Sequence, residues 1–114
     1  MHKQKDIVLV PIPFTDLSSI KKRPVVIISQ DNYNSQSRDV VVAAITSNLS
    51  YRNDYSIIID SENLSEGFLP KQSMVRCDKI YTISGDIIVK RFGVISHETF
   101  IVIKTKIDEL FAGE

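Results

Sequence analysis

The chain has 114 residues, 43% of them hydrophobic and 25% charged, so it is long enough for one domain with an ordinary core, which we place at residues 1–114. Its 14 cationic and 14 acidic side chains cancel, which excludes coating of nucleic acid through a general positive field and leaves only a local patch for such contact. A single cysteine excludes an intrachain disulfide and a zinc cluster.

The first elements that the sequence predicts are two buried strands joined by a polar loop. Residues 6–12 (DIVLVPI) are almost wholly apolar, and the prolines at 11 and 13 end the run because they cannot donate to a ladder. A loop (PFTDLSSIKKR, 13–23) leads to a second strand (PVVIIS, 24–29). The first apolar run is too short for a signal peptide or a membrane span, so we expect a cytoplasmic protein without a membrane partner.

Several further short strands follow. Apolar runs predict them at residues 40–45 (VVVAAI), 55–60 (YSIIID) and 73–80 (SMVRCDKI), and one or two more surround Gly85 and Gly93. The polar segment 30–39 is expected to be a connection with one helical turn, and residues 61–72 are expected to be a loop. Short strands at this spacing favour a small barrel or a strongly bent sheet.

The end of the chain predicts a helix. Ser96 is suited to cap its start and Gly113 follows its end. Its β-branched residues lower the intrinsic helix propensity, but the apolar spacing of three and four residues is helical. That spacing is set by Phe100, Ile103, Ile107 and Leu110. The predicted fold is therefore mainly β, with five to seven short, strongly twisted strands and a C-terminal helix.

Polar residues gather where the predicted strands begin or end. Three cations, Lys21, Lys22 and Arg23, precede the second strand, either as a solvated turn or as part of a site. Thr46 closes the third strand, either as a turn residue that bonds its own backbone or as a hydroxyl donor to a ligand. Arg76 and Asp78 share one face of a strand, which allows an ion pair or an acid–base pair.

Four segments, in this order, resemble the MazF/PemK/Kid toxins, the ribosome-independent endoribonucleases of bacterial toxin–antitoxin pairs. They are DIVLVPIPFTDLSS, KRPVVIIS, VVVAAITSN and SMVRCDKIYTI, and together they span nearly the whole chain. The sequence departs from the family at Lys5-Asp6, where the family usually has Gly-Asp or Gly-Glu.

The resemblance implies an SH3-like small barrel that pairs as a homodimer, a cognate antitoxin as a protein partner, and metal-independent cleavage of single-stranded RNA without a cofactor. It places catalytic roles on Arg23 and Thr46. In the Kid branch of the family, an acid and a base fall on Arg76 and Asp78.

These residue types suit RNA cleavage by the internal 2′-hydroxyl. A guanidinium such as that of Arg23 neutralises phosphate oxygens with two parallel hydrogen bonds, and fixed cations aimed at developing charge often supply the largest catalytic term.

Cys77 should be a small buried hydrophobe and His97 an exposed residue without a catalytic role. The loop before Arg23 should help to bind RNA through an aromatic ring and cations, unless Phe14 packs into the core. The RNA-binding residues expected are Phe14, Thr15, Asp16, Lys21, Lys22, Ser47 and Asn48.

Two other functions fit the same fold, because fold alone does not fix function. One is a toxin that binds and poisons DNA gyrase without cutting RNA. The other is a non-catalytic SH3-like binding module. The joint presence of Arg23, Thr46, Arg76 and Asp78 favours the nuclease.

Overall fold

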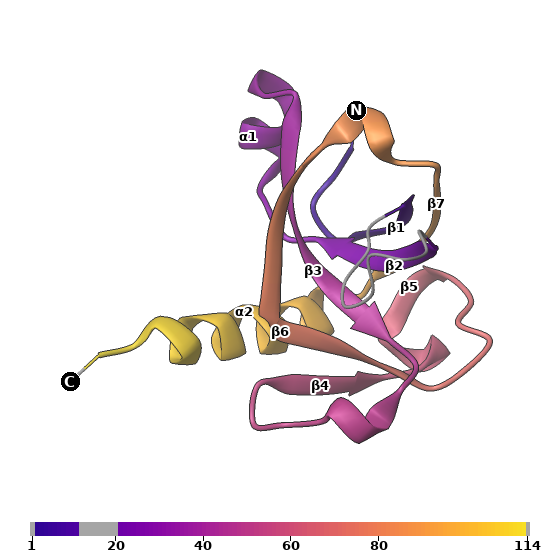
Figure 1. Ribbon diagram of the computed structural model, residues 1–114, viewed down its shortest axis with the longest axis vertical. Helices are drawn as coiled ribbons and strands as arrows, with labels where there is room; N and C mark the ends of the chain where they lie inside the picture. Colours follow the sequence, from indigo (N-terminus) through magenta and orange to yellow (C-terminus); the bar gives the residue numbers. More distant parts are fainter. Residues whose placement is uncertain (1, 12–20, 114) are drawn as a thin grey trace.

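The computed structural model describes residues 2–11 and 21–113, whose strands form one antiparallel sheet that curls into a half barrel (Figure 1). The strand order across the sheet is β4-β6-β3-β2-β1-β7-β5. This confirms the predicted fold class. The strands are β1 (Asp6–Pro11), β2 (Lys22–Ile27), β3 (Asp39–Thr46), β4 (Ser56–Ile59), β5 (Leu64–Gly67), β6 (Ser73–Ser84) and β7 (Lys90–Ile95).

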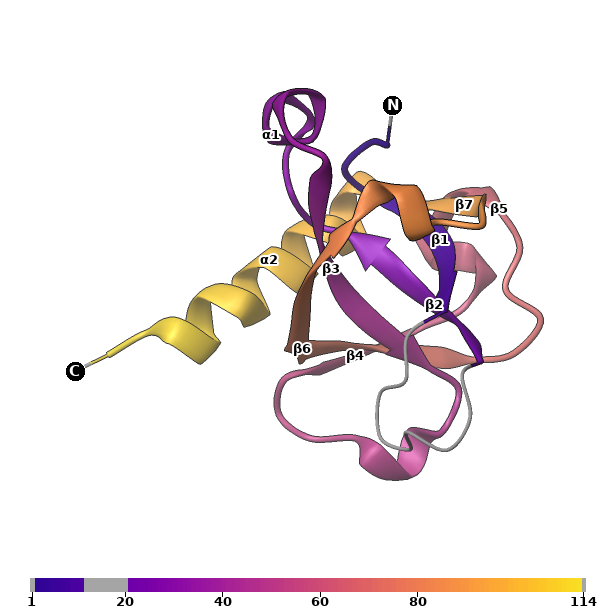
Figure 2. The same cartoon turned by 45° about the horizontal axis from the view of Figure 1, so that its top comes forward.

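Two α-helices accompany the sheet. The short α1 (Asp31–Gln36) is the helical turn expected between the second and third strands. The longer α2 (His97–Phe111) packs on β6 and β4, and its last turns run away from the sheet (Figures 1 and 2). Ser96 caps its start, because the side-chain oxygen accepts a hydrogen bond from the Thr99 N–H at 3.2 Å. The predicted C-terminal helix is therefore confirmed. No helix in the described part of the chain is long and apolar enough to cross a membrane.

The edge strand β5 lies in the segment that was expected to be a loop, so that expectation is wrong. Its sequence, LSEG, lacks an apolar alternation because it packs only at the sheet edge beside β7. Gly67 ends it at a φ of +89°, in the left-handed region. A Cβ atom there would lie 2.7 Å from the Gly93 Cα and would also collide with the Phe92 carbonyl oxygen, so only glycine fits.

The sheet buries a different apolar cluster on each face. The face that α2 covers contains the larger cluster, and the opposite face contains a smaller one, the inner cluster. Alternation along β1, β2 and β3 sends neighbouring residues to opposite clusters. The larger cluster includes Ile7, Val26, Ala43, Ile45, Val75, Phe100 and Ile103, and the smaller is Val8, Val10, Val25, Ile27, Val40 and Val42.

A bulge in β6 bends the sheet sharply. Ala43 of β3 pairs with Ile80, but the next residue, Ala44, pairs with Arg76. Residues 77–79 are therefore extra on β6 and have no partner on β3. Such bulges bend the bulged strand and re-aim its side chains. The bend lies beside the end of β3, where the sequence had predicted functional residues.

Lys5, where the chain departs from the resembled family, has a φ of +80°. This backbone conformation favours glycine, which explains why the family usually has glycine at that position. The ammonium of Lys5 lies 5.8 Å from the centre of the Phe100 ring.

Candidate active site

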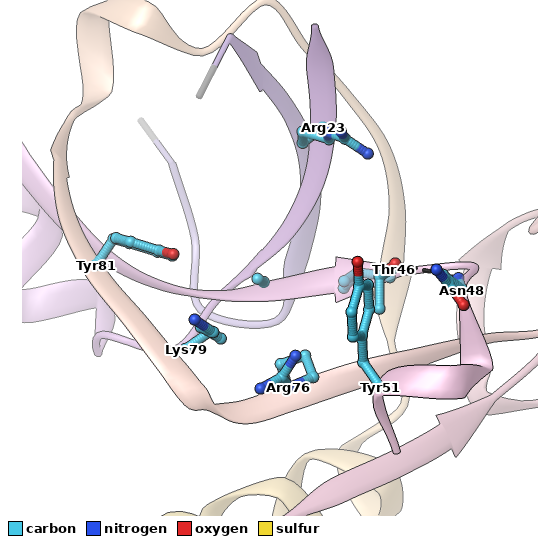
Figure 3. Close-up of a pocket in the computed structure, with 9 residues that line it drawn as sticks. Arg23, Thr46, Asn48, Tyr51, Arg76, Lys79 and Tyr81 are labelled. Atoms are coloured by element: carbon cyan, nitrogen blue, oxygen red, sulfur yellow. Dashed lines mark hydrogen bonds between the residues drawn. The ribbon is translucent and has the colours of Figure 1, made fainter. Parts of the chain in front are cut away.

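A pocket of about 200 Å³ opens where the ends of β2 and β3 face the bulge of β6 (Figure 3). Three of its side chains are cationic and three others carry hydroxyl groups. No histidine or carboxylate is among the described residues that line it. The lining residues are Arg23, Ala44, Ile45, Thr46, Asn48, Tyr51, Arg76, Lys79 and Tyr81.

Arg23 is the only one of the three cations in the Lys21–Arg23 run that lines this pocket. It is half-buried, whereas Lys21 and Lys22 are exposed. Along β2, Arg23 alternates with Pro24 and points to the same face as Val25 of the inner cluster. Its guanidinium makes no hydrogen bond or ion pair with any described residue. The geometry leaves Arg23 available to an anionic ligand.

Thr46 is both a turn residue and a pocket residue. Its hydroxyl oxygen accepts a hydrogen bond from the Asn48 N–H at 3.1 Å, as in the turn that the sequence suggested. Because the oxygen is the acceptor, the hydroxyl hydrogen remains able to donate into the pocket. Asn48 in turn caps the 3-10 turn η1 (Leu49–Tyr51) by accepting from the Ser50 N–H at 3.1 Å. This turn therefore fixes the position of the Thr46 hydroxyl.

Arg76 and Asp78 form an ion pair with two parallel hydrogen bonds. The distances are 3.0 Å from Nε to Oδ1 and 3.1 Å from Nη2 to Oδ2. Asn53 donates a further hydrogen bond of 3.1 Å to Asp78. The bonds with Arg76 hold the pKa of Asp78 below its ordinary value, and the bonds with Asp78 raise the pKa of Arg76. Arg76 lines the pocket and Asp78 lies behind it.

Three polar side chains of the pocket were not predicted from the sequence. Tyr51 stands at the mouth of the pocket, about half exposed, with its ring 5.9 Å from the Arg76 guanidinium carbon. Lys79 and Tyr81 come from β6 (Figure 3). The aromatic residue after the third strand was a usable signal for Tyr51, because exposed aromatic rings are typical of single-stranded RNA sites.

The remaining predicted residues lie elsewhere. Ser47 and Lys22 line a second cavity, described below, and Lys21 lines neither pocket. Phe14, Thr15 and Asp16 lie outside the described residues, so their expected role in RNA binding stays a prediction.

Two expectations about reactive side chains are also met by the geometry. His97 is exposed at the start of α2, and Cys77 is completely buried. Burial raises the pKa of the Cys77 thiol to about 12, which keeps it protonated and unreactive. Within residues 2–11 and 21–113, no group of three or more His, Cys, Asp or Glu side chains could hold a metal ion.

We predict that Asp78→Asn lowers the free energy of unfolding by about 1–3 kcal/mol near neutral pH, because the substitution breaks a mostly buried charged hydrogen bond. The folded-state pKa of Asp78 is below its ordinary value of 3.8. The stabilisation is therefore fully present above that value and disappears as the pH falls through the lower folded-state pKa. Urea denaturation of both proteins across this pH range measures it. A difference between them that stays constant in acid would contradict the prediction.

The fold and the pocket define a small antiparallel half barrel with a cationic, hydroxyl-rich site at its strand ends. The family model of PemK-like, MazF-like toxins of type II toxin–antitoxin systems matches residues 3–111. The chain therefore belongs to this family. A comparison with curated protein sequences found no match.

Solved structures share the fold. The toxin MazF-mt6 of Mycobacterium tuberculosis is 22% identical, with a TM-score of 0.75 over 93% of this chain and 95% of that one. A mycobacterial endoribonuclease in complex with its cognate antitoxin is 19% identical, with a TM-score of 0.76 over 100% of both chains. In a MazE–MazF structure from Deinococcus radiodurans, the matching chain is 10% identical, with a TM-score of 0.73 over 99% of this chain and 97% of that one.

Proposed function

We propose that this protein is an endoribonuclease toxin that cleaves single-stranded RNA without a metal ion. The observation that carries the proposal is the pocket itself, which Arg23, Arg76 and Lys79 line together with the hydroxyl-bearing Thr46. Three cations around one donor make a site for a phosphate group. Membership of a family of toxins, which typically cut RNA, supports the same function.

In the proposed reaction, the 2′-hydroxyl of one nucleotide attacks the phosphorus that follows it and gives its proton to a water molecule, since no carboxylate or histidine is among the described residues that line the pocket. Negative charge grows on the phosphate oxygens, and the 5′-oxygen of the next nucleotide leaves. Arg23 and Arg76 stabilise the charged oxygens, and the Thr46 hydroxyl donates to one of them. Lys79 can donate a proton to the departing 5′-oxygen, which leaves as a hydroxyl, and regain a proton from water. The products would carry a 2′,3′-cyclic phosphate and a 5′-hydroxyl.

We assign Asp78 a positioning role rather than that of a general base. Both of its oxygens already accept hydrogen bonds from Arg76, and a carboxylate with a lowered pKa is a weak base. The paired carboxylate holds the Arg76 guanidinium at the edge of the pocket. Tyr51 packs beside that guanidinium and restricts it further.

We also propose two protein partners. One is a second copy of the chain, because family members pair in this way and exposed apolar side chains remain on the surface, among them Val102 and Phe111 on α2. Sedimentation of a species of only 12.9 kDa at micromolar concentration would refute the homodimer. The other is an acidic antitoxin that covers the cations Lys21, Lys22 and Arg23, because carboxylates are attracted to a local cation cluster. One structurally similar mycobacterial endoribonuclease is in complex with its cognate antitoxin. Unchanged inhibition of a variant without these cations would exclude that contact.

Purified protein should cut a long single-stranded RNA in the absence of ribosomes and gyrase, and equally well in excess chelator. The reason is that the charges which stabilise the phosphate belong to the side chains of the pocket. Sequencing the new 5′ ends gives the cleavage sites, and phosphorylation of those ends by a kinase checks for 5′-hydroxyl groups. Intact RNA, together with inhibition of purified gyrase, would replace this proposal with the gyrase-binding alternative.

A further inference from the structure

A second cavity, of about 420 Å³, lies on the other face of the sheet from the first pocket. The first pocket opens on the side of the inner cluster, to which Arg23 and Thr46 point. The second opens on the side of Ile45 and Leu69, which belong to the larger cluster. Its lining comes from β1, β2, β7, the end of β3 with the residue after it, the segment between β5 and β6, and the first residue of β6. The residues are Leu9, Lys22, Arg23, Pro24, Ile45, Thr46, Ser47, Leu69, Pro70, Lys71, Ser73, Lys90 and Phe92.

The floor of this cavity consists of apolar side chains from β1, β2 and β7, and strand pairing brings them to one face of the sheet. Leu9 of β1 lies opposite Pro24 on β2 and opposite Lys90 on β7, so the three side chains share one face. Phe92 is the extra residue of a bulge in β7, because Ile7 pairs with Gly93 while Val8 pairs with Arg91. The bulge places its ring at the cavity. An aromatic and aliphatic surface of this kind can hold a flat base.

Three exposed lysines surround that floor. Lys22, Lys71 and Lys90 come from three separate parts of the chain, and none forms an ion pair with a described acidic residue. Arg91, next to Lys90, differs because it pairs with Glu66 at 2.9 Å. Since the net charge of the whole chain is zero, this cluster is a local concentration of uncompensated positive charge. It suits a ligand that carries several negative charges close together.

The two cavities meet at the residues of the proposed reaction. Arg23, Ile45 and Thr46 line both. The pairing of β2 with β3 ends at Val25 and Ala44, so these two strands no longer pair with each other beyond that point, although each stays paired with its other neighbour. Pro24, the next residue on β2, has no N–H with which to continue the ladder. Arg23 and Thr46 therefore form a rim, and a ligand can pass over this rim from one face of the sheet to the other.

We propose that the second cavity binds the RNA nucleotide next to the one held in the first pocket. This inference rests on the proposed function. The base lies against Leu9 and Phe92, and Lys71 and Lys90 neutralise the neighbouring phosphates. The strand bends over the rim so that the scissile phosphate reaches Arg23 and Thr46. Only a flexible single strand can bend over these strand ends in this way. A stiff RNA duplex cannot, so the site should not bind duplex RNA.

The test compares a Lys71→Gln/Lys90→Gln double variant with a Lys3→Gln/Lys104→Gln control. The control removes the same charge from two exposed lysines that line neither cavity. The probe is a single-stranded RNA oligonucleotide of mixed sequence with 2′-O-methyl groups throughout, which binds but cannot react. Its Kd is measured from about 50 to 200 mM salt. Unmodified RNA of the same sequence is then cleaved at limiting and at saturating enzyme.

The cavity variant should bind the methylated RNA about tenfold more weakly, and the slope of log K against log salt should become shallower by about 1.4 for two lost phosphate contacts. Relative to wild type, the rate at which this variant cleaves unmodified RNA should fall more at limiting enzyme than at saturating enzyme, because the lost contacts mainly weaken binding. The control should match wild type. Phe92→Leu, which keeps an apolar side chain, should weaken binding without changing the salt slope, because it removes stacking and no charge.

Wild-type affinity and salt slope in the cavity variant would overturn the inference. It would also be overturned if that variant kept its RNA affinity but lost binding to poly-glutamate, since the cavity would then fit an acidic protein segment. A wild-type protein that binds the methylated RNA but leaves unmodified RNA intact would contradict the proposed cleavage. Because the binding comparison uses RNA that cannot react, it still decides the cavity assignment in that case.

Discussion

Arg23→Ala should slow single-turnover cleavage of a short RNA by about 100- to 1,000-fold, the loss typical of one fixed donor that stabilises developing negative charge. Arg23 has no described hydrogen-bond or ion-pair partner within the protein, so its guanidinium is not committed to the fold. Its position on the rim shared by both cavities places it where the bending strand would present a phosphate. A large effect on rate should therefore come with almost no effect on stability.

The Arg23→Lys variant tests whether cleavage needs only a positive charge at this position or also the planar shape of the guanidinium. Lysine keeps the positive charge but presents a single ammonium, which cannot reproduce the two parallel hydrogen bonds of a guanidinium to a phosphate. We expect it to recover little of the lost rate. Thermal melting of each variant is the control, and the expected change in the free energy of unfolding is below about 0.5 kcal/mol, because Arg23 lies at the surface, only half-buried, and has no described partner. Wild-type cleavage by a folded Arg23→Ala protein would remove Arg23 from the proposed mechanism.

The strands and the terminal helix could be predicted from the sequence because burial requires apolar residues in regular runs or at regular spacing. The runs that form β1, β2 and β3 are almost wholly apolar, since both faces of these strands pack against a cluster. The terminal helix was readable from its spacing despite its β-branched residues, because Phe100 and Ile103 are buried against the sheet. Packing outweighed intrinsic propensity there.

Fewer residues of the site could be predicted, because its lining depends on how strands from separate parts of the sequence pair. Period-two alternation within one strand placed Arg76 and Asp78 together, and the structure shows their ion pair. The bulge that turns Lys79 into the pocket arises only from the pairing of β6 with β3. The approach of Lys71 and Lys90 depends on β5, which the sequence did not indicate. No pattern within a single segment of the sequence predicts the bulge in β6 or the approach of these two lysines.

Thr46→Ala should slow cleavage by about 100-fold, because it removes the hydroxyl that we place on a phosphate oxygen. The same substitution deprives the Asn48 N–H of its acceptor, but Asn48 is exposed and water can replace the bond. The cost in stability should therefore stay below about 1 kcal/mol. Thr46→Ser keeps both the acceptor for Asn48 and the hydroxyl hydrogen, and should retain cleavage within about tenfold of wild type.

Thr46→Val separates the two roles of the hydroxyl, because valine has nearly the shape of threonine but neither accepts nor donates a hydrogen bond. If the hydroxyl acts on the phosphate, the valine and alanine variants should lose cleavage to the same extent while binding uncleavable RNA nearly as well as wild type. The loss then falls on the rate at saturating enzyme, which is the mark of an interaction made in the transition state. Single-turnover rates and RNA affinities of the three variants, with thermal melts beside them, measure this. If the alanine and valine variants cut RNA at the wild-type rate, Thr46 is only a turn residue, and the pocket must act through its cations alone.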